Sequence, residues 1–579
     1  INVKIDGFQL NSASGINTNG VLANAANGLS ITNNVFSNLT TTAYSNHNGA
    51  AAQSNITFNT NRVDGNNTAA ISAINAWDGI NNVTINSNYF TEFQRGVQFD
   101  NASNVTVSNN HFVAIGFQGL QVATLCSNIN VLSNTFDNCN TIAEIDRGAI
   151  RLYAGVTGDI VIEKNIFKNN HNAVRVRSAD PYTHTFFKVR YNIFESSNTN
   201  SLSDGSTSPT GKTNGLCNWY GVINGPTIAT NPGGAGEVLV DPNGQVNYRN
   251  WLMYGNDQDA ILPGFQIPTA ITVVPGTNTS VAENHYRVLS NAVGCALAGQ
   301  VITLNGTFDW TNATAQAEWA KGNDGIVSAA DDYSILAPIN VNNVKLTASP
   351  QYNGVVQGPG DLAAANLEAV FVFDGGDNQD WIVENLEIKD IDLAIYFGNG
   401  AGGVDAFNNV KVRNNKIWIP KDLNTTVAPA DPNQNIGLHY SFGTNQEISG
   451  NIFEVDGTGV SAAPNYSASV VMQSNTDGVT AYDGLQIKNN TIHINGVQDA
   501  NPAIILGIWE NGHNLNSAIT ISGNIFTNLA VGNVPASNLQ RAFRVTSKSG
   551  ATKQVIYENN EVDGANIGIQ WIDLSLIHI

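Results

Sequence analysis

The stretch Val83-Thr84-Ile85-Asn86-Ser87-Asn88-Tyr89-Phe90 decides the fold, because its pattern, apolar-x-apolar-x-x-Asn-x-apolar, recurs along the chain. Its first three residues alternate as they would in a β-strand, with Val83 and Ile85 on one face. The middle of the stretch turns the chain, and Phe90 then lies inward on a second strand. Asn tolerates the left-handed backbone region better than other non-glycine residues, so we expect the repeated Asn to form the corner itself.

The copies fall into two blocks, separated by more than two hundred residues. The repeated Asn residues are Asn34, Asn61, Asn88, Asn110, Asn134, Asn165 and Asn192, then Asn415, Asn451, Asn490, Asn524 and Asn560. Two residues after each Asn stands Phe36, Val63, Phe90, Phe112, Phe136, Phe167, Phe194, Ile417, Phe453, Ile492, Phe526 or Val562. Repeats of roughly 20 to 50 residues indicate a solenoid, so function is to be sought on a stacked surface.

Each repeat has room for three short strands and three turns, but not for a helix. Successive rungs of such a coil pair in parallel about 4.8 Å apart. Phe would then stack on Phe and Asn on Asn from rung to rung. A stacked Asn can hydrogen-bond to the rungs above and below, which would satisfy buried amides at the corner.

These repeats resemble the right-handed parallel β-helix proteins, the pectate-lyase-like fold that polygalacturonases, phage tailspikes and many bacterial surface proteins share. The resemblance implies an all-β chain made of two tandem right-handed parallel β-helices. It implies no single activity, because this fold carries many chemistries.

The domain limits follow from where the repeat stops and resumes. We expect a first β-helix over residues 1–260, closed by a cap segment at 215–254, a linker at 261–282, and a second β-helix over 283–573. The cap resembles segments that close bacterial β-helix domains, with Trp219-Tyr220-Gly221 followed by Trp251-Leu252. A short capping helix is expected at the start of the second β-helix, where Val288, Leu289, Ala292 and Val293 have helical spacing.

Two features at the ends indicate a piece of a longer protein. The chain begins inside a rung, at Val3-Lys4-Ile5, and residues 574–579 break the repeat and look non-native. No membrane-spanning run and no signal peptide are apparent in the sequence. We therefore expect further sequence, with any export signal, outside these 579 residues.

Composition excludes some partners. The formal net charge is −20, and only 12% of residues are charged. Binding to nucleic acid or to anionic membranes needs basic surfaces, so we expect neither, nor any insertion into a membrane. Uncharged polar faces rich in Asn, Thr, Ser and Gly suit a monomeric extracellular or cell-surface solenoid.

The four cysteines do not indicate whether the protein lies in an oxidising or a reducing compartment. They form no CxxC pair, which disfavours a zinc site. Cys126 and Cys139 lie in one rung on opposite sides of its repeat. The two cysteines could form a disulfide bond or remain as buried free thiols, and the sequence favours the free thiols.

The first block offers the best candidate surface. Strands before each repeat align so that Val97, Leu120, Ile150 and Val174 point inward, and their successors then form an outward ladder. The candidate binding residues are Gln98, Gln121, Arg151 and Arg175 on this ladder, Tyr153 and Arg177 on a second one, and Lys188 one strand on.

Three hypotheses account for this cluster. Arg presents a planar fork that suits carboxylate or sulfate groups, so an anionic polysaccharide could lie along the ladder. Related polysaccharide lyases use outward basic residues, which makes Arg151 and Arg175 candidate catalytic residues. The third hypothesis is a solvated face on which Glu144, Asp146 and His171 pair with the arginines and bind nothing.

Other motifs are weaker. Asp374, Asp377 and Asp380 lie in a Gly-containing loop, where carboxylates could hold calcium, although no cofactor is required by the sequence. Asn475-Thr476-Asp477-Gly478 resembles the first catalytic motif of polygalacturonases, but their paired Asp-Asp motif is absent.

The sequence therefore favours a noncatalytic, adhesin-like β-helix protein that presents a polar face to glycans or another surface. A lyase acting on anionic polysaccharide is the first alternative, and a spacer or stalk without a ligand is the second.

Overall fold

The structure is a computed structural model of the chain, and it contains two units, Ile1–Pro268 and Thr269–Ile579. The residues that it describes are 3–11, 20–23, 26–46, 53–65, 72–76, 79–153, 155–177, 184–195, 198–206, 211–315, 336, 338–359, 369–373, 380–391, 393–397, 407–420, 436–440, 443–456, 469–473, 484–495, 506–511, 519–528, 541–547, 555–564 and 567–573.

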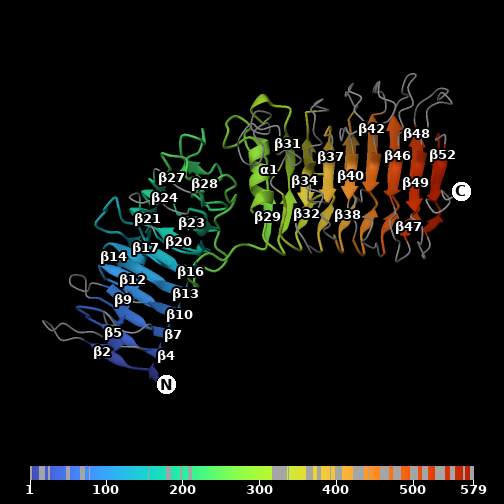
Figure 1. Cartoon of the computed structure of the whole chain (residues 1–579). Coiled ribbons are helices and arrows are strands. Elements are labelled where there is room, and N and C mark those ends of the chain that lie inside the picture. The colour runs from blue at the N-terminus through green and yellow to red at the C-terminus, as the bar shows by residue number, and fades with distance from the viewer. Residues whose placement is uncertain are drawn as a thin grey trace. The chain divides into compact units, whose positions relative to one another are not determined.

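The first unit is a stack of rungs whose strands form three parallel sheets, called A, B and C here (Figure 1). Sheet A contains β1 (Val3–Asp6), β4 (Asn27–Thr32), β7 (Gln53–Asn59), β10 (Ile80–Asn86), β13 (Ala102–Ser108), β16 (Ser127–Leu132), β19 (Ile160–Glu163), β22 (Phe187–Arg190), β25 (Thr213–Asn214) and β28 (Val246–Asn247). Sheet B contains β2 (Gln9–Asn11), β5 (Val35–Ser37), β8 (Arg62–Asp64), β11 (Tyr89–Thr91), β14 (His111–Ile115), β17 (Thr135–Cys139), β20 (Ile166–Lys168) and β23 (Ile193–Phe194). Sheet C contains β3 (Val21–Ala23), β6 (Tyr44–Asn46), β9 (Ser72–Ala76), β12 (Arg95–Phe99), β15 (Gln118–Val122), β18 (Ile150–Leu152), β21 (Asn172–Val176), β24 (Asn200–Asp204), β27 (Gly236–Val240) and β26 (Pro226–Thr227). A 3-10 turn, η1 (His184–Phe186), precedes β22.

The repeated Asn forms a buried ladder along the inside of the corner between sheets A and B. Asn134 illustrates one step: its Oδ1 accepts from the backbone N–H and from Nδ2 of Asn110, both at 2.9 Å. Its own Nδ2 donates to Val107 O at 2.9 Å and to Asn165 Oδ1 at 3.0 Å. Each amide thus satisfies backbone groups of its neighbours, which confirms the predicted Asn stacking.

The expectation that the repeated Asn itself adopts the left-handed backbone is wrong. The residue before it does so, with φ of 55° at Ser87, 55° at Ser133 and 58° at Lys164. The second unit follows the same rule, with Gly450 at 63° before its Asn451. Non-Asn residues therefore tolerate the turn, and the following Asn is required for its amide hydrogen bonds.

Aromatic rings form the second ladder, inside the core. Phe112, Phe136 and Phe167 are fully buried, and their rings stack at centroid distances of 4.7 and 5.1 Å. The stack ends on Phe194 and Tyr220, whose centroids lie 5.5 Å apart. Offset stacking of this kind adds to the free energy of burial.

The cap is built partly as one more rung. Asn192 Nδ2 donates to Asn218 Oδ1 at 3.0 Å, so Asn218 extends the ladder beyond the last copy recognised in the sequence. Trp251 is buried, and a Cβ at Gly225, where φ is 73°, would stand 2.5 Å from its ring. Only glycine allows that approach.

Residues 261–282, expected as a linker, belong to both units. Gly264 N donates to Thr135 Oγ1 at 3.0 Å, and Phe265 N donates to Lys164 O at 2.7 Å, so this part lies on the first unit. Residues 270–273 instead form the first strand of the second unit.

Cys126 and Cys139 are free and buried, as favoured from the sequence. Burial raises the pKa of the Cys126 thiol to about 11 and raises the pKa of Cys139 as well. Both thiols therefore stay protonated at neutral pH and act as small apolar side chains.

The second unit repeats the plan with sheets A′, B′ and C′ (Figure 1). Sheet A′ contains β29 (Ala270–Val273), β30 (Val301–Leu304), β32 (Lys345–Ala348), β35 (Ile382–Glu384), β38 (Lys411–Arg413), β41 (Glu447–Ser449), β44 (Gln486–Lys488), β47 (Ile519–Ser522) and β50 (Val555–Glu558). Sheet B′ contains β31 (Gly306–Asp309), β33 (Gly354–Gln357), β36 (Glu387–Lys389), β39 (Lys416–Ile419), β42 (Ile452–Asp456), β45 (Thr491–Asn495), β48 (Ile525–Asn528) and β51 (Glu561–Asp563). Sheet C′ contains β34 (Ala369–Phe373), β37 (Leu393–Phe397), β40 (Ile436–Tyr440), β43 (Ser469–Gln473), β46 (Leu506–Asn511), β49 (Arg541–Ser547) and β52 (Ile567–Asp573).

The predicted capping helix is α1 (His285–Gly294), which lies at the first rungs of this unit (Figure 1). Asn284 caps it, and its side chain accepts a hydrogen bond from Arg287 N at 2.8 Å. Tyr286 packs edge-on against Trp310, with ring centroids 6.0 Å apart. An amphipathic helix here shields the apolar interior of the first rungs.

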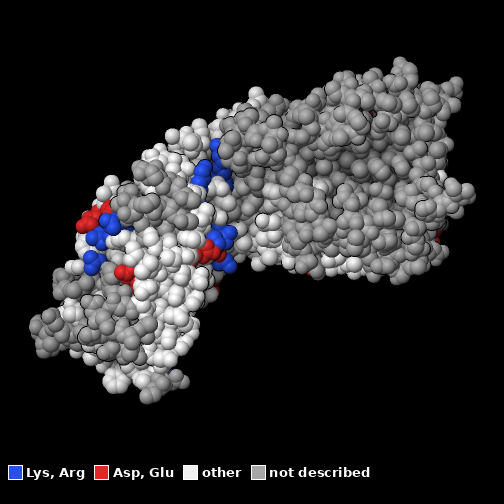
Figure 2. All heavy atoms as spheres, in the orientation of Figure 1, with Lys and Arg blue, Asp and Glu red and all other residues white. Residues whose placement is uncertain are grey.

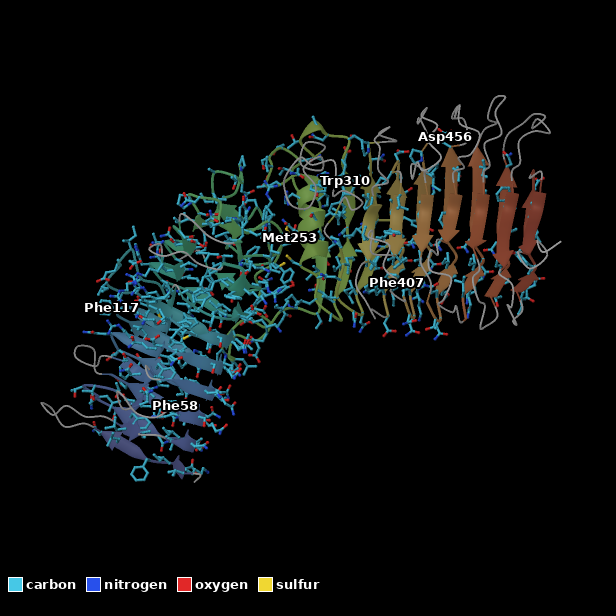
Figure 3. All side chains as sticks on the ribbon, viewed as in Figure 1. Phe58, Phe117, Met253, Trp310, Phe407 and Asp456 are labelled. Atoms are coloured by element: carbon cyan, nitrogen blue, oxygen red, sulfur yellow. The ribbon has the colours of Figure 1, made fainter. Side chains whose placement is uncertain are left out.

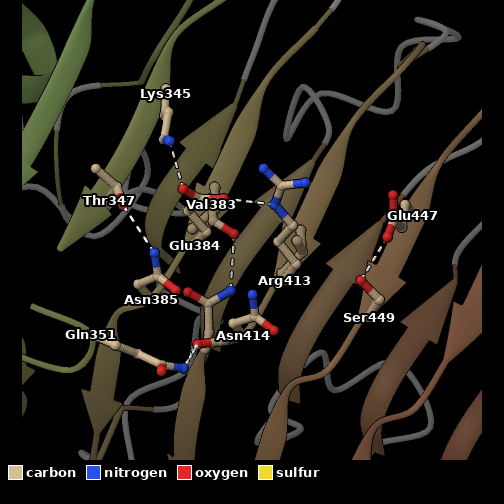
Figure 4. Close-up of polar contacts among 12 residues, drawn as sticks. Lys345, Thr347, Gln351, Val383, Glu384, Asn385, Arg413, Asn414, Glu447 and Ser449 are labelled. Atoms are coloured by element: carbon tan, nitrogen blue, oxygen red, sulfur yellow. Dashed lines mark hydrogen bonds and ion pairs between the residues drawn. The ribbon is translucent and has the colours of Figure 1, made fainter. Parts of the chain in front are cut away.

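Ion pairs join neighbouring rungs on the outer face of sheet A′ (Figure 4). Glu384 lies between Lys345 and Arg413, at 2.6 Å from each, and its side chain is 9% exposed. Burial acts to raise the pKa of Glu384, but hydrogen bonds and charges from Lys345 and Arg413 lower it overall. The charged carboxylate therefore stabilises the fold.

Replacement of Asn134 by Ala tests the Asn ladder. The change leaves the two Asn110 donors without their acceptor and should lower the free energy of unfolding by about 3 kcal/mol. Asn130→Ala, on the half-buried outward row of the same rung, should change it by less than about 0.5 kcal/mol. Urea denaturation measures both. Equal effects of the two variants would contradict the role given to the ladder.

Glu384→Gln tests the sheet A′ ion pairs. The pKa of Glu384 is lower in the folded state than in the unfolded chain, where a Glu side chain has a pKa of about 4.3. Ionised Glu384 therefore stabilises the folded state above that pH, and this stabilisation is lost as the pH falls through the folded-state pKa. The wild type should lose stability more steeply than Glu384→Gln below about pH 4.3. Glu558→Gln, at an exposed position of the same register row, is the control. Parallel pH profiles for the wild type and Glu384→Gln would refute this assignment.

Candidate functional site

The outward ladder expected from the sequence is present on sheet C. Strand β12 pairs with β15, β15 with β18, and β18 with β21, all in parallel. The register places Gln98, Gln121, Arg151 and Arg175 in one row across these strands. Apolar residues on both sides of the row in each strand are buried in the core. By the alternation of a strand, the row therefore points away from the core.

This row is nevertheless covered by other side chains. Exposed fractions run from 2% for Gln98 to 9% for Arg175. Gln98 Nε2 donates to Ser72 Oγ, and Gln118 Nε2 donates to Gln121 Oε1 at 2.6 Å. The row is thus a packed polar layer rather than a solvated face.

Asp146 brings three of the predicted arginines together. Its carboxylate lies 2.5 Å from Arg151 Nη2, 3.7 Å from Arg177 Nε and 3.9 Å from Arg175 Nε. Arg175 also donates through Nη1 to Ser203 Oγ at 2.6 Å. Asp146 belongs to the connection between β17 and β18, which crosses to sheet C at this point.

Two of the guanidinium groups have hydrogen-bond donors that are not used. Within the described residues, Nε of Arg151 and Nε of Arg175 are buried and have no hydrogen-bond partner. Burial lowers the pKa of Arg151, and the charge of Arg147 adds to this, while Tyr153 and Asp146 act against it. Partly desolvated cations with unused donors favour a further oxyanion.

Arginine also stacks on aromatic rings. Tyr153 lies between Arg151 and Arg177, whose guanidinium carbons are 4.5 and 5.0 Å from its ring centroid. Cation–π contacts of this kind hold a guanidinium plane in a fixed orientation. All three residues were predicted from the sequence as candidate binding residues, and the structure places them together.

A second stack was missed. Phe117 lies between Arg95 and Arg147, with guanidinium carbons 5.3 and 4.6 Å from its ring centroid. Arg147 Nε also donates to Glu144 Oε2 at 2.9 Å. The aligned strands could have revealed Arg95, because it pairs in register with Gln118 immediately before the Gly-apolar-Gln pattern.

These residues make a cationic patch in a strongly acidic protein. Within the described residues, Arg95, Arg147, Arg151, Arg175 and Arg177 carry five positive charges, and the ion pairs among them involve two carboxylates, Glu144 and Asp146. Figure 2 shows basic and acidic side chains side by side at one edge of the first unit, where Figure 3 labels Phe117. The patch therefore keeps an excess of positive charge.

Lys188 does not join this patch. It lies on β22 of sheet A, and its Nζ is 2.5 Å from Asp159 Oδ2. On the same sheet, Arg190 forms an ion pair with Glu163. Paired charges on a half-exposed surface contribute little free energy, so these residues extend the polar surface of sheet A.

The calcium hypothesis is not decided by the structure. Asp374 and Asp377 lie outside the described residues, and Asp380 is exposed with φ of 66°. In the part of the chain that the structure describes, His, Cys, Asp and Glu form no group of three able to hold a metal ion. The polygalacturonase-like motif at 475–478 lies outside the described residues.

Comparison with known proteins agrees with this architecture. The model of the family described as "Right handed beta helix region" matches residues 19–189. The matched residues lie in the first unit, and the three parallel sheets of each unit show an all-β fold of two parallel β-helical units. No curated protein matches the chain.

Among solved structures, the alginate lyase AlyGC of the PL6 family is similar to the chain. The match has 10% sequence identity and a TM-score of 0.25, and it covers 92% of this chain and 77% of the lyase. A likeness at this level carries no information about activity. Among the described helices, none is long and apolar enough to cross a membrane.

Calcium binding near Asp377 can be tested by thermal unfolding. If the carboxylates of Asp374, Asp377 and Asp380 hold the ion, millimolar calcium should raise the melting temperature of the wild type, because the ion binds the folded state. Asp377→Ala should remove that increase, whereas magnesium should not reproduce it. A melting temperature that calcium leaves unchanged would exclude the site.

Proposed function

We propose that this protein is a noncatalytic, extracellular glycan-binding β-helix whose ligand is an anionic polysaccharide. The observation that carries the proposal is the convergence of Arg151, Arg175 and Arg177 on the single carboxylate of Asp146. Arginine recognises planar carboxylate and sulfate groups through paired hydrogen bonds.

The electrostatics support an anionic ligand. The protein as a whole has a net charge of −20, so a local excess of arginine is not a by-product of composition. Overall repulsion from a polyanion would restrict binding to the patch and would make it depend strongly on salt. Uncharged Asn, Ser and Thr side chains on the other rungs suit hydroxyl-rich sugars.

The aromatic stacks support a sugar polymer over a small anion. Tyr153 and Phe117 each lie between two guanidinium groups on the same face. These contacts fix the orientation of four guanidinium groups, and a polymer with anionic groups on successive sugars can contact several of them at once.

Binding is preferred to lyase catalysis because the carboxylates of the patch and Arg151 are engaged in ion pairs with one another. Proton abstraction needs a group free to accept a proton. Glu144 pairs with Arg147, and Asp146 with Arg151, so both carboxylates face cations. Among the described residues of the patch, no histidine or lysine takes their place.

Binding to polygalacturonate tests the function, with dextran as a neutral control. The wild type should bind polygalacturonate, weakly in high salt, and leave its chain length unchanged. Arg177→Ala should weaken binding about tenfold, because it removes one charge-assisted contact of about 1.4 kcal/mol. Lys188→Ala removes the same charge from sheet A and should have no effect.

Three results would change the assignment. If Arg177→Ala and Lys188→Ala weakened binding to polygalacturonate equally, the affinity would depend only on the net charge of the protein. Release of unsaturated uronates that Arg151→Ala abolishes would favour the lyase. Failure of the wild type to bind either polygalacturonate or dextran sulfate would leave the spacer hypothesis.

A further inference from the structure

The connection between β17 and β18 lies across the arginine row. Residues 140–147 form this segment, called the strap here, and residues 141–145 are exposed along its length. The strap ends at Gly148, where an added Cβ would stand 3.0 Å from the Cβ of Arg175. The strap is therefore positioned directly beside the guanidinium groups.

Hydrogen bonds near both ends fasten the strap. Thr141 N donates to Ile115 O at 3.3 Å, Ile142 N donates to Gly116 O at 3.4 Å, and Arg147 Nη1 donates to Gln118 Oε1 at 3.2 Å. Asn172 Nδ2 donates to the backbone oxygens of Ile145 and Arg147, at 3.2 and 2.7 Å. Asn140 Nδ2 donates to Glu144 O at 3.0 Å. The apolar side chains do not anchor it, because Ile142 is 50% exposed and Ile145 is 77% exposed. Lifting the strap would therefore uncover little apolar surface.

The strongest attachment is the carboxylate of Asp146. One of its oxygens faces Arg151 and Arg177, and the other faces Arg175. This is the arrangement that three arginines would offer to the carboxylate of a ligand. The Asp146 side chain remains 43% exposed, so the position it occupies is open to solvent on one side.

Asp146 does not satisfy the group fully. Nε of Arg151 makes no hydrogen bond to it, and Nε of Arg175 is 3.9 Å away, too long for a hydrogen bond. A ligand with its own carboxylate or sulfate could use these donors, which Asp146 leaves unused.

We propose that Asp146 is an intramolecular competitor, whose carboxylate occupies the anion subsite formed by Arg151, Arg175 and Arg177. An anionic glycan binds there only when the strap withdraws Asp146. The strap thereby sets the affinity of the site and excludes weak anions. This inference rests on the proposed glycan-binding function and adds its regulation.

Population-shift arithmetic gives the expected size of the effect. The apparent dissociation constant equals the intrinsic one divided by the fraction of molecules in which the subsite is vacant. Removal of the competing charge raises that fraction. Coupling between such sites is commonly about five- to 150-fold, so we expect at least a fivefold gain in affinity.

The variant Asp146→Asn keeps the size of the side chain and removes its charge. It should bind polygalacturonate at least about fivefold more tightly than the wild type. Asp159→Asn is the matched control, because it makes the same change to a carboxylate that pairs with Lys188, outside the cationic patch. It should bind about as the wild type does. Melting temperatures of both variants show whether the fold is kept.

Hydrogen exchange of the wild type gives a second readout that does not depend on a variant. The amide of Arg147 donates to Glu144 O within the strap, at 3.1 Å. Saturating polygalacturonate should increase exchange at residues 141–147, because the ligand displaces the strap. Ordinary binding over a fixed strap would instead protect those amides.

The outcomes separate this inference from the proposed function. If Arg177→Ala weakens binding but Asp146→Asn binds no more tightly than the wild type, the strap inference is wrong and glycan binding stands. If the ligand slows hydrogen exchange at the strap amides, the strap inference is likewise wrong and glycan binding stands. If neither the wild type nor Asp146→Asn binds polygalacturonate or dextran sulfate, the proposed function fails together with the inference.

Discussion

The amide of a buried Asn, which recurs from Asn34 to Asn218 and from Asn415 onward, is the interaction on which each coil depends. A parallel solenoid turns its backbone at every corner, and the N–H and C=O groups there cannot all pair within a sheet. Asn carries both a donor and an acceptor on a short side chain, so it can bond to the rung on either side. The ladder from Asn34 to Asn218 and the ladder from Asn415 to Asn560 solve the same problem in the two units.

Because the interior is fixed by repetition, the outer faces are free to vary. Sheet A uses uncharged side chains from β4 to β16, whereas sheet A′ uses ion pairs such as Glu384 with Arg413. Sheet C gathers five arginines, Tyr153 and Phe117 on or beside a few neighbouring strands. Its chemistry is set by single side chains and by one connection, the strap at residues 140–147, that the repeat does not dictate. Function in such a fold is thus separable from stability.

Much of the fold could be predicted from the sequence. The spacing of Asn and Phe predicted the rungs and the stacking of both ladders. The cap was expected from a resemblance to other β-helix domains, and the helix α1 from that resemblance and from the helical spacing of its apolar residues. The backbone conformation at the corner was assigned to the wrong residue, because a propensity for left-handed backbone was given more weight than hydrogen bonding. Asn218 was missed because its rung begins with Thr213-Asn214-Gly215 instead of two apolar residues.

The candidate site was predicted only in part. Periodicity placed Gln98, Gln121, Arg151 and Arg175 in one row, but it could not place the strap, which crosses the row without following the repeat. The depth of burial of the row and the meeting of three arginines at Asp146 therefore came only from the structure. In the sequence, Lys188 lies one strand after Arg175 and Arg177. It belongs to a different sheet, because the chain turns between the strands of each rung.

The most direct measurement is a crystal structure of the protein with a short oligouronate bound. The account predicts a sugar carboxylate in contact with Arg151, Arg175 and Arg177, and Asp146 moved away from them. An oligouronate bound at any other surface, with Asp146 still between the three arginines, would contradict it.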